Sequence, residues 1–106
     1  MAVAETKDRL YLLPTDYADP EHGGEVFHCR DCITVEGMLA AYPQHAANIE
    51  IIRVPWPRPR TAVVEAIGEE NQNLPALVFA EGGFANDIDG LMVALHQRHG
   101  FPRSRP

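Results

Sequence analysis

The sequence lacks the features that define several large classes of protein. Its 106 residues include only two cysteines, too few for a disulfide scaffold. No apolar run approaches the roughly 18 to 20 residues that a membrane-spanning helix requires. The first residues, Met1 to Asp8, show no apolar core or cleavage pattern of the kind that directs secretion. Fifteen acidic residues against nine basic ones give a net charge of −6, which argues against nucleic-acid binding. We therefore expect a cytoplasmic protein that binds neither nucleic acid nor membrane.

What remains is the composition of an ordinary globular domain. Hydrophobic residues make up 45% of the chain and charged residues 23%, which are typical values. A chain of 106 residues can bury one modest core. We expect a single domain over residues 1–106, with loose termini at residues 1–7 and 101–106.

Apolar patterning and the positions of proline and glycine predict an alternation of strands and helices. Strands are expected at 9–13, 49–54 and 75–80, with a short edge strand near 84–85. Helices are expected at about 31–42, 60–67 and 87–99, where Asn86 or Asp87 caps the last one. A long loop is expected over 14–28 and a solvated turn over 69–73. The predicted order is therefore β-α-β-α-β-β-α.

The two cysteines form the motif Cys29-Arg-Asp-Cys32 between a strand-like run and the first predicted helix. Two thiols at this spacing can close a small disulfide, and the unpaired amides of a helix N-terminus stabilise a thiolate. Cys29 precedes the helix, so it is the candidate nucleophile, and Cys32 is the candidate resolving thiol. The alternatives are a structural pair or a zinc site completed by His22 and His28. We expect no metal, because the pair supplies only two of the four ligands of zinc.

The element order, with this motif at the first strand-to-helix junction, resembles the thioredoxin-like superfamily. Leu74-Pro75, just before the third strand, matches the cis-proline position of that superfamily. The resemblance covers Asp8 to about His99 and implies an α/β three-layer sandwich with a four-stranded mixed sheet. It further implies thiol–disulfide oxidoreductase activity. A cis Leu74–Pro75 bond would leave the Leu74 backbone free to pair with an extended substrate, so that Leu74 and Pro75 shape a groove.

More narrowly, the chain resembles an uncharacterised bacterial family of short thioredoxin-like proteins, a domain of unknown function. The stretches that carry this resemblance are Phe27-His-Cys29-Arg-Asp-Cys32, Trp56-Pro-Arg-Pro-Arg60, Gly68-Glu-Glu-Asn-Gln72 with Leu74-Pro75, and His99-Gly-Phe-Pro102. This resemblance implies a fold and no established reaction.

Four segments are expected to meet at one rim of the sheet. Cys29 follows the first strand and Trp56 to Arg60 follow the second, and parallel strands joined by a helix end at the same edge. In the resembled fold, the third strand starts and the fourth ends at this edge, which adds Leu74-Pro75, Asn86 and Asp87. The sequence therefore predicts one site built from sequence-distant segments around Cys29.

The segment Trp56-Pro-Arg-Pro-Arg60 has two interpretations. Its prolines end a strand and stiffen the connection. Alternatively, Arg58 and Arg60 bind the carboxylate of an acidic thiol, with at least one guanidinium directed at the rim, while Trp56 forms an apolar wall.

Asn86 and Asp87 also have two interpretations, a helix cap or, by resemblance to glutaredoxins, a turn that holds a glutathione carboxylate. We expect no cofactor, and we expect protein or small-molecule thiols and disulfides as partners, with glutathione as one candidate substrate. The rival function is a non-catalytic binding or adaptor module that uses the same rim.

Overall fold

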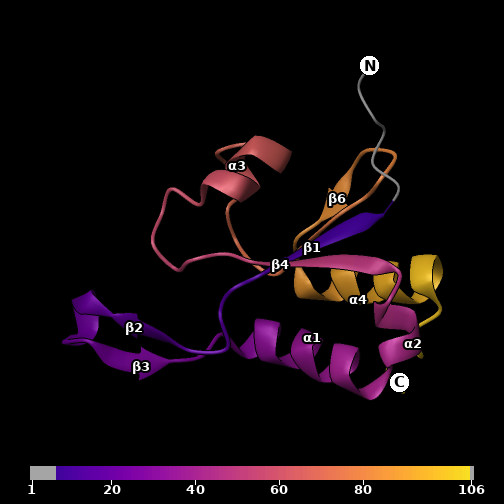
Figure 1. The fold of residues 1–106 in the computed structure, drawn as a ribbon, viewed down its shortest axis with the longest axis horizontal. Coiled ribbons are helices and arrows are strands. Elements are labelled where there is room, and N and C mark those ends of the chain that lie inside the picture. The colour runs from indigo at the N-terminus through magenta and orange to yellow at the C-terminus, as the bar shows by residue number, and fades with distance from the viewer. Residues whose placement is uncertain (1–6, 106) are drawn as a thin grey trace.

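The computed structural model describes residues 7–105, which form an α/β fold (Figure 1). In chain order the elements are β1 (Asp8–Leu12), β2 (Tyr17–Asp19), a 3₁₀ turn η1 (Pro20–His22), β3 (Glu25–Phe27), α1 (Arg30–Ala41), α2 (Pro43–Ala46), β4 (Ile49–Arg53), α3 (Thr61–Ile67), β5 (Ala76–Val78), β6 (Phe84–Ala85) and α4 (Ile88–His99). None of the helices in this part of the chain has the length and apolar character needed to cross a membrane.

Four strands form a mixed sheet in the order β4-β1-β5-β6. β4 is parallel to β1, β5 is antiparallel to β1, and β6 is antiparallel to β5. In the centre of the sheet, Leu10 lies opposite Ile51 on one side and Leu77 on the other. Helices α1 and α4 lie on one face and α3 lies on the other (Figure 1). The predicted α/β class and the four-stranded mixed sheet are confirmed.

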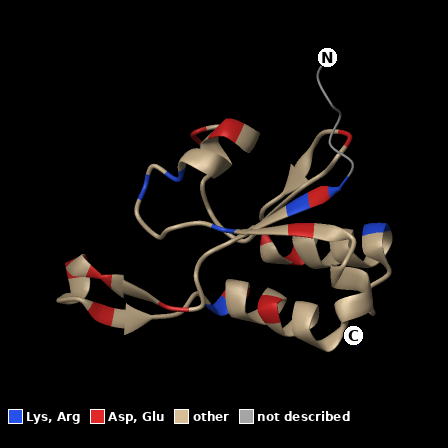
Figure 2. Cartoon of the chain, viewed as in Figure 1, with Lys and Arg blue, Asp and Glu red and all other residues tan. Residues whose placement is uncertain are grey.

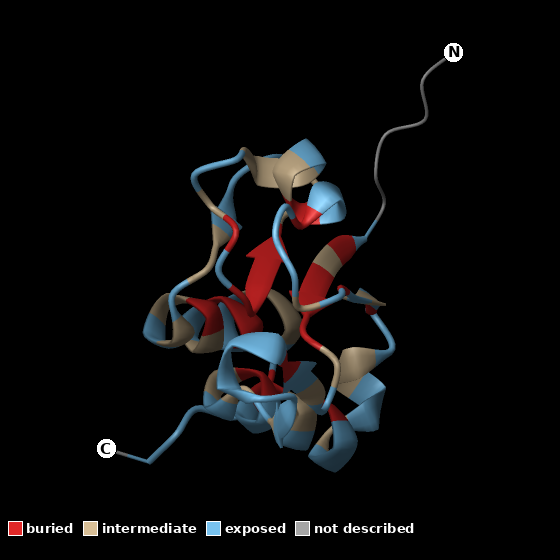
Figure 3. Cartoon of the chain, turned by 90° about the vertical axis from the view of Figure 1, so that its left-hand side faces the viewer, coloured by how far each residue is buried: buried red, intermediate tan, exposed pale blue. Residues whose placement is uncertain are grey.

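The core lies between the sheet and the helices, as the burial of the apolar strand positions requires. Buried residues concentrate on the central strands and on the inward turns of the helices (Figure 3). The largest fully buried side chains are Phe101, Leu10, Leu12, Leu77, Leu91, Leu95, Val35, Val63 and Cys32. Cys32 is therefore part of the core as well as of the Cys-X-X-Cys motif.

The segment 14–28 is not the long loop that the sequence predicts. It contains an antiparallel hairpin, hereafter the β2–β3 hairpin, in which Tyr17 lies opposite Phe27. Gly23 and Gly24, with φ angles of 68° and 81°, make its turn, a conformation that glycine adopts without a steric penalty. The hairpin projects from the body of the molecule beside the start of α1 (Figure 1). Three-residue strands are too short for alternation of apolar and polar residues to be recognised.

The C-terminal segment is also better packed than expected. Phe101 is fully buried and makes an edge-on ring contact with Tyr42, so the tail is exposed only from Pro102 to Arg105. The expectation of a loose terminus at 1–7 lies, except for Lys7, outside the described residues. The first helix ends before Pro43, as the sequence predicts, and Pro43 then begins the short helix α2, where a missing N–H has no cost.

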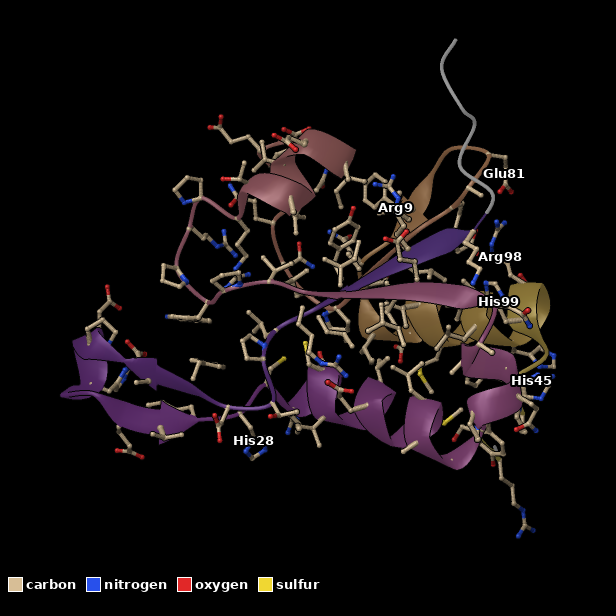
Figure 4. All side chains as sticks on the ribbon, viewed as in Figure 1. Arg9, His28, His45, Glu81, Arg98 and His99 are labelled. Carbon is tan, nitrogen blue, oxygen red and sulfur yellow. The ribbon has the colours of Figure 1, made fainter. Side chains whose placement is uncertain are left out.

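A buried ion-pair network joins β1 to α4. Asp8 is only 3% exposed and accepts hydrogen bonds from Arg98 (2.6 and 2.8 Å), from His99 (2.7 Å) and from the N–H of Ala80 (2.8 Å). Arg98 also pairs with Glu81 at 2.6 Å. In Figure 4 Arg98, His99 and Glu81 lie together, on the opposite side of the molecule from the β2–β3 hairpin. This network stabilises the fold at a distance from the two cysteines.

Candidate functional site

A cleft of about 490 Å³ opens beside the first turn of α1. Its walls come from the β2–β3 hairpin, from the segment after β4 and from the segment before β5, with one thiol among them. The lining residues are Leu13, Tyr17, Asp19, Pro20, Glu21, Cys29, Trp56, Pro57, Arg58, Arg60, Asn73 and Leu74. Cys29, Trp56, Arg58, Arg60 and Leu74, all predicted from the sequence to share one site, therefore line the same cleft.

Cys29 is the N-cap residue of α1, and its position follows from the hairpin that leads into the helix. Its sulfur accepts a hydrogen bond from the N–H of Cys32 at 3.3 Å, so the side chain occupies the place of an N-capping group. Cys29 is partly exposed, whereas Cys32 is only 2% exposed, and neither forms a disulfide. The prediction that Cys29 is the more accessible thiol is confirmed.

Cys32 lies one turn further into α1 and faces the core. Its sulfur accepts a hydrogen bond from the N–H of Leu13 at 3.5 Å, just after β1. Burial raises the pKa of the Cys32 thiol to about 12, because the thiolate loses its hydration there. Near neutral pH Cys32 is therefore a protonated thiol, held beneath the accessible sulfur.

The Leu74–Pro75 peptide bond is cis, as predicted, and the Leu74 backbone lies beside Cys29. The carbonyl oxygen of Leu74 lies 4.0 Å from the sulfur of Cys29. A second cis bond, Arg58–Pro59, was not predicted from the sequence. Leu74, at the end of the segment before β5, thus forms one side of the cleft, directly beside the accessible thiol of Cys29.

Two aromatic rings connect the hairpin to the segment after β4. Tyr17 and Trp56 stack with ring centroids 4.4 Å apart and an interplanar angle of 9°. The guanidinium of Arg60 lies 5.1 Å from the centroid of the Trp56 ring, in a cation–π contact. Burial raises the pKa of the Tyr17 hydroxyl. The stack supports the hairpin as a wall of the cleft.

The two arginines of this segment have different roles. Arg60 is only 4% exposed, and its guanidinium donates to the backbone oxygens of Trp56 (3.0 Å) and Gln72 (2.8 Å). Its backbone N–H donates to the side-chain oxygen of Gln72 at 2.8 Å. Burial lowers the pKa of Arg60, although a guanidinium remains charged at any physiological pH. Arg58 is exposed, and within residues 7–105 its side chain makes no hydrogen bond or ion pair.

Replacement of Arg60 by lysine is expected to destabilise the fold by about 1 to 3 kcal/mol. A lysine ammonium cannot reach the oxygens of Trp56 and Gln72 with the geometry of a guanidinium, so a buried acceptor is left unpaired. Urea unfolding, followed by circular dichroism, measures the change. The matched control is Arg58→Lys, which we expect to change stability by less than about 0.5 kcal/mol because Arg58 is exposed. Equal effects of the two substitutions would contradict the role given to Arg60.

Asn86 and Asp87 do not line the cleft, in contrast to the expectation that they share the rim. Asp87 caps α4, where its carboxylate accepts the N–H of Gly90 at 2.8 Å. Asn86 is paired with Asn73: its side-chain amide donates to the side-chain oxygen of Asn73 at 3.0 Å, and its backbone oxygen accepts from Asn73 in return. It is Asn73 that lines the cleft, so Asn86 acts on the site only through this pair.

The residues that a zinc site was considered to use are not gathered around the thiols. His22 is hydrogen-bonded to Asp19 at 2.8 Å, and His28 is exposed and points away from the body of the molecule (Figure 4). Over residues 7–105, no group of three or more His, Cys, Asp or Glu side chains is arranged to hold a metal ion.

Comparison with known proteins places the chain in a family. Residues 7–103 match the sequence model of a family described as "Protein of unknown function (DUF3088)". The chain belongs to this family. No curated protein and no solved structure matched the chain in the corresponding searches. The match covers both cysteines and every segment that lines the cleft, while the family's description specifies no reaction.

Sequence reasoning missed the contributions of the hairpin and of the turn at 69–73. Tyr17 and Glu21 were assigned to a loop, although they line the cleft. Gln72 and Asn73 were assigned to a solvated turn, although Gln72 is 7% exposed and binds Arg60. No local pattern places Tyr17, Gln72 or Asn73 at the site, because Trp56, Arg60 and Asn86, their contacts there, lie at least twelve positions away in the chain.

Proposed function

We propose that the protein is a thioredoxin-like thiol–disulfide oxidoreductase in which Cys29 attacks the substrate and Cys32 resolves the intermediate. One observation carries the proposal. An accessible thiol at the N-terminus of a helix lines an open cleft, and a buried second thiol lies one turn below it. Two cysteines with a purely structural role require neither a cleft beside one thiol nor a difference in exposure between the two thiols.

The topology supports the thioredoxin-like assignment. The strand order β4-β1-β5-β6, with β4 parallel and β5 antiparallel to β1, agrees with the sheet that the resemblance implies. Helices on both faces agree with the three layers (Figure 1). The Cys-X-X-Cys motif at the start of α1 and the cis proline before β5 agree with the two positions on which the resemblance rests.

The proposed reaction is a dithiol–disulfide exchange. The Cys29 thiolate attacks one sulfur of a disulfide RS–SR, so that the Cys29–SR bond forms, the RS–SR bond breaks and RS⁻ leaves and takes up a proton. Cys32 then loses its proton and attacks the sulfur of Cys29, which forms the Cys29–Cys32 disulfide and releases the second RS⁻. The protein loses two electrons and the substrate gains them. An external dithiol must reduce the protein again for turnover.

The burial of Cys32 favours this order of events. The N–H of Cys32 already points at the Cys29 sulfur, so it can stabilise negative charge on that atom. Cys32 itself is protonated near neutral pH, and attack by Cys32 must therefore follow its deprotonation after the mixed disulfide has formed. The Leu74 backbone beside Cys29 is the proposed pairing edge for an extended substrate.

The substrate is proposed to be a protein or small-molecule thiol or disulfide in the cytoplasm, a reducing compartment in which two lone cysteines stay reduced. Arg58 is the proposed contact for a substrate carboxylate, including that of glutathione, because its guanidinium has no partner within residues 7–105. Arg60, the other arginine considered for this role, is committed to the backbone. No cofactor and no nucleic acid enters the proposed reaction.

A redox titration tests the proposal. The protein is equilibrated in buffers with different ratios of reduced to oxidised glutathione, and in dithiothreitol buffers for the lowest potentials, the remaining thiols are alkylated, and the products are counted by mass spectrometry. We expect a two-electron transition between about −270 and −120 mV, the range of dithiol oxidoreductases. A transition below about −300 mV would identify a structural disulfide. Two free thiols at every ratio would instead favour the non-catalytic binding module.

A further inference from the structure

The two walls of the cleft carry charges of opposite sign. The β2–β3 hairpin contributes Asp19 and Glu21, and the segment after β4 contributes Arg58 and Arg60. Figure 2 shows acidic and no basic segments on the hairpin, and basic segments on the loop that leads to α3. The wall formed by the hairpin thus presents negative charge to the cleft, and the wall formed by the segment after β4 presents positive charge.

One charged side chain on each wall is already held by hydrogen bonds within the protein. Asp19 accepts from His22 at 2.8 Å and from the N–H of Glu21 at 2.9 Å, and the bond from His22 holds its pKa below the ordinary value. Arg60 is held by the two backbone oxygens described above. Glu21 and Arg58 are exposed, and within residues 7–105 the side chain of neither makes a hydrogen bond or an ion pair. Each wall therefore offers one uncommitted charge to a ligand.

Between these two charges the cleft is mostly apolar. Leu13, Pro20, Trp56, Pro57 and Leu74 form the surface around Cys29. The volume of about 490 Å³ lies within the about 300 to 1,000 Å³ typical of small-molecule sites. A ligand that matches this surface has a compact apolar centre that contains sulfur, and it carries both signs of charge.

We infer that the substrate class is a small zwitterionic disulfide, one whose halves each carry an ammonium and a carboxylate. This inference rests on the proposed function. A dianionic disulfide is attracted by Arg58 but opposed by Glu21 and by the net charge of −6. A dicationic disulfide is attracted by Glu21 and opposed by Arg58. Only a zwitterion is favoured by both walls, because its ammonium pairs with Glu21 and its carboxylate with Arg58.

The chemistry is the exchange described above, with R bearing both charges. The reduced protein gives two electrons to one disulfide molecule, which leaves as two zwitterionic thiols, and the protein retains the Cys29–Cys32 disulfide. The walls orient the disulfide so that one sulfur faces Cys29.

Four small symmetrical disulfides that differ in charge test the inference. They are cystine (zwitterionic), cystamine (dicationic), 3,3′-dithiodipropionate (dianionic) and 2-hydroxyethyl disulfide (neutral). Oxidation of the reduced protein is followed by the emission of Trp56, the sole tryptophan, with mass spectrometry as a check. Each rate is divided by the rate of the same disulfide with dithiothreitol, which removes the effect of the leaving thiol. We expect cystine to exceed the neutral disulfide by about tenfold at low salt, and the preference to shrink as salt screens the charges.

Two variants assign this preference to the walls. Glu21→Gln and Arg58→Gln are each expected to reduce the ratio of the cystine rate to the neutral rate by about three- to fivefold, the effect of one exposed charge pair. The matched controls are Glu25→Gln, on the same hairpin but outside the cleft, and Arg103→Gln, near the C-terminus. Both controls are expected to keep the ratio of the unmodified protein. All four side chains are exposed, so circular dichroism is expected to show native folding throughout.

The outcomes separate this inference from the proposed function. Equal normalised rates for all four disulfides, or a preference for cystamine or the dianion, would overturn the zwitterionic class and leave the oxidoreductase intact. A preference for cystine that survives both cleft variants would also overturn it. If no disulfide, including the neutral one, oxidises the cysteine pair, the proposed function itself fails.

Discussion

Cys29→Ser is expected to lower the rate of reaction with any disulfide by at least about a thousandfold, to the uncatalysed background. Cys29 is the accessible thiol in the cleft, and Cys32 is buried with a pKa raised to about 12. A serine hydroxyl is not a nucleophile toward disulfides, and Cys32 cannot replace Cys29 without moving out of the core. Mixed-disulfide formation, measured by mass spectrometry after exposure to 2-hydroxyethyl disulfide, reports the loss.

The matched variant is Cys32→Ser, which keeps the nucleophile and removes the resolving thiol. We expect it to accumulate a stable mixed disulfide on Cys29, because no second thiol releases the substrate. In native Cys29→Ser protein, iodoacetamide is expected to label Cys32 slowly near pH 8 and quickly only after unfolding. Rapid native labelling of Cys32 would reverse the roles assigned to the two residues.

Asp8→Asn is expected to destabilise the fold by about 2 to 4 kcal/mol without blocking the exchange reaction of the folded protein. The carboxylate is buried and accepts bonds from Arg98, His99 and the N–H of Ala80. Removing one partner of a buried ion pair leaves the other incompletely paired. Arg98 keeps its ion pair with the exposed Glu81, which reduces the expected loss of folding stability. Chemical unfolding at neutral pH measures the difference.

The contribution of Asp8 is expected to disappear in acid. Arg98 holds the pKa of Asp8 well below its ordinary value of about 3.9. A carboxyl whose pKa is lowered by folding adds stability that is fully present above the pKa of the unfolded chain and is lost as the pH falls toward the folded value. The stability gap between the unmodified protein and Asp8→Asn should therefore be constant from about pH 6 to 5 and narrow below about pH 4.

Asp16→Asn is the control for this titration. Asp16 is exposed, and within residues 7–105 its side chain makes no ion pair, so we expect a change of less than about 0.5 kcal/mol at any pH. If the difference in the free energy of unfolding between the unmodified protein and Asp8→Asn stays constant down to pH 2, the charge of the Asp8 carboxylate is not the source of the stabilisation.

Local signals in the sequence were enough for the position of the accessible thiol. Cys29 immediately precedes an amphipathic run, and the N-cap of a helix is decided by residues within one turn of it. For the same reason the cap of α4 could be narrowed to Asn86 or Asp87, of which Asp87 is the cap, and Gly100, with a φ angle of 76°, could be recognised as its end. The order of strands and helices followed from apolar periodicity, which is also a property of neighbouring residues.

The walls of the site depended on contacts between distant segments. Whether Tyr17 belonged to a loop or to a wall was decided by its stacking on Trp56. The division between the two arginines was decided by Gln72, which lies twelve positions after Arg60 and offers it two acceptors. Nothing in the residues around Arg58 and Arg60 distinguishes the buried guanidinium from the free one.

The sequence by itself thus determined the α/β class, the accessible thiol and part of the rim, because these follow from capping, periodicity and the connection rule for parallel strands. The cis Leu74–Pro75 bond and the rest of the rim were expected from the resemblance to the thioredoxin-like superfamily. Only the tertiary structure decided which charges at that rim are free. A charged side chain is free or committed according to the acceptors and donors that reach it, and in Arg60 and Asp8 these come from segments that meet only after the chain has folded.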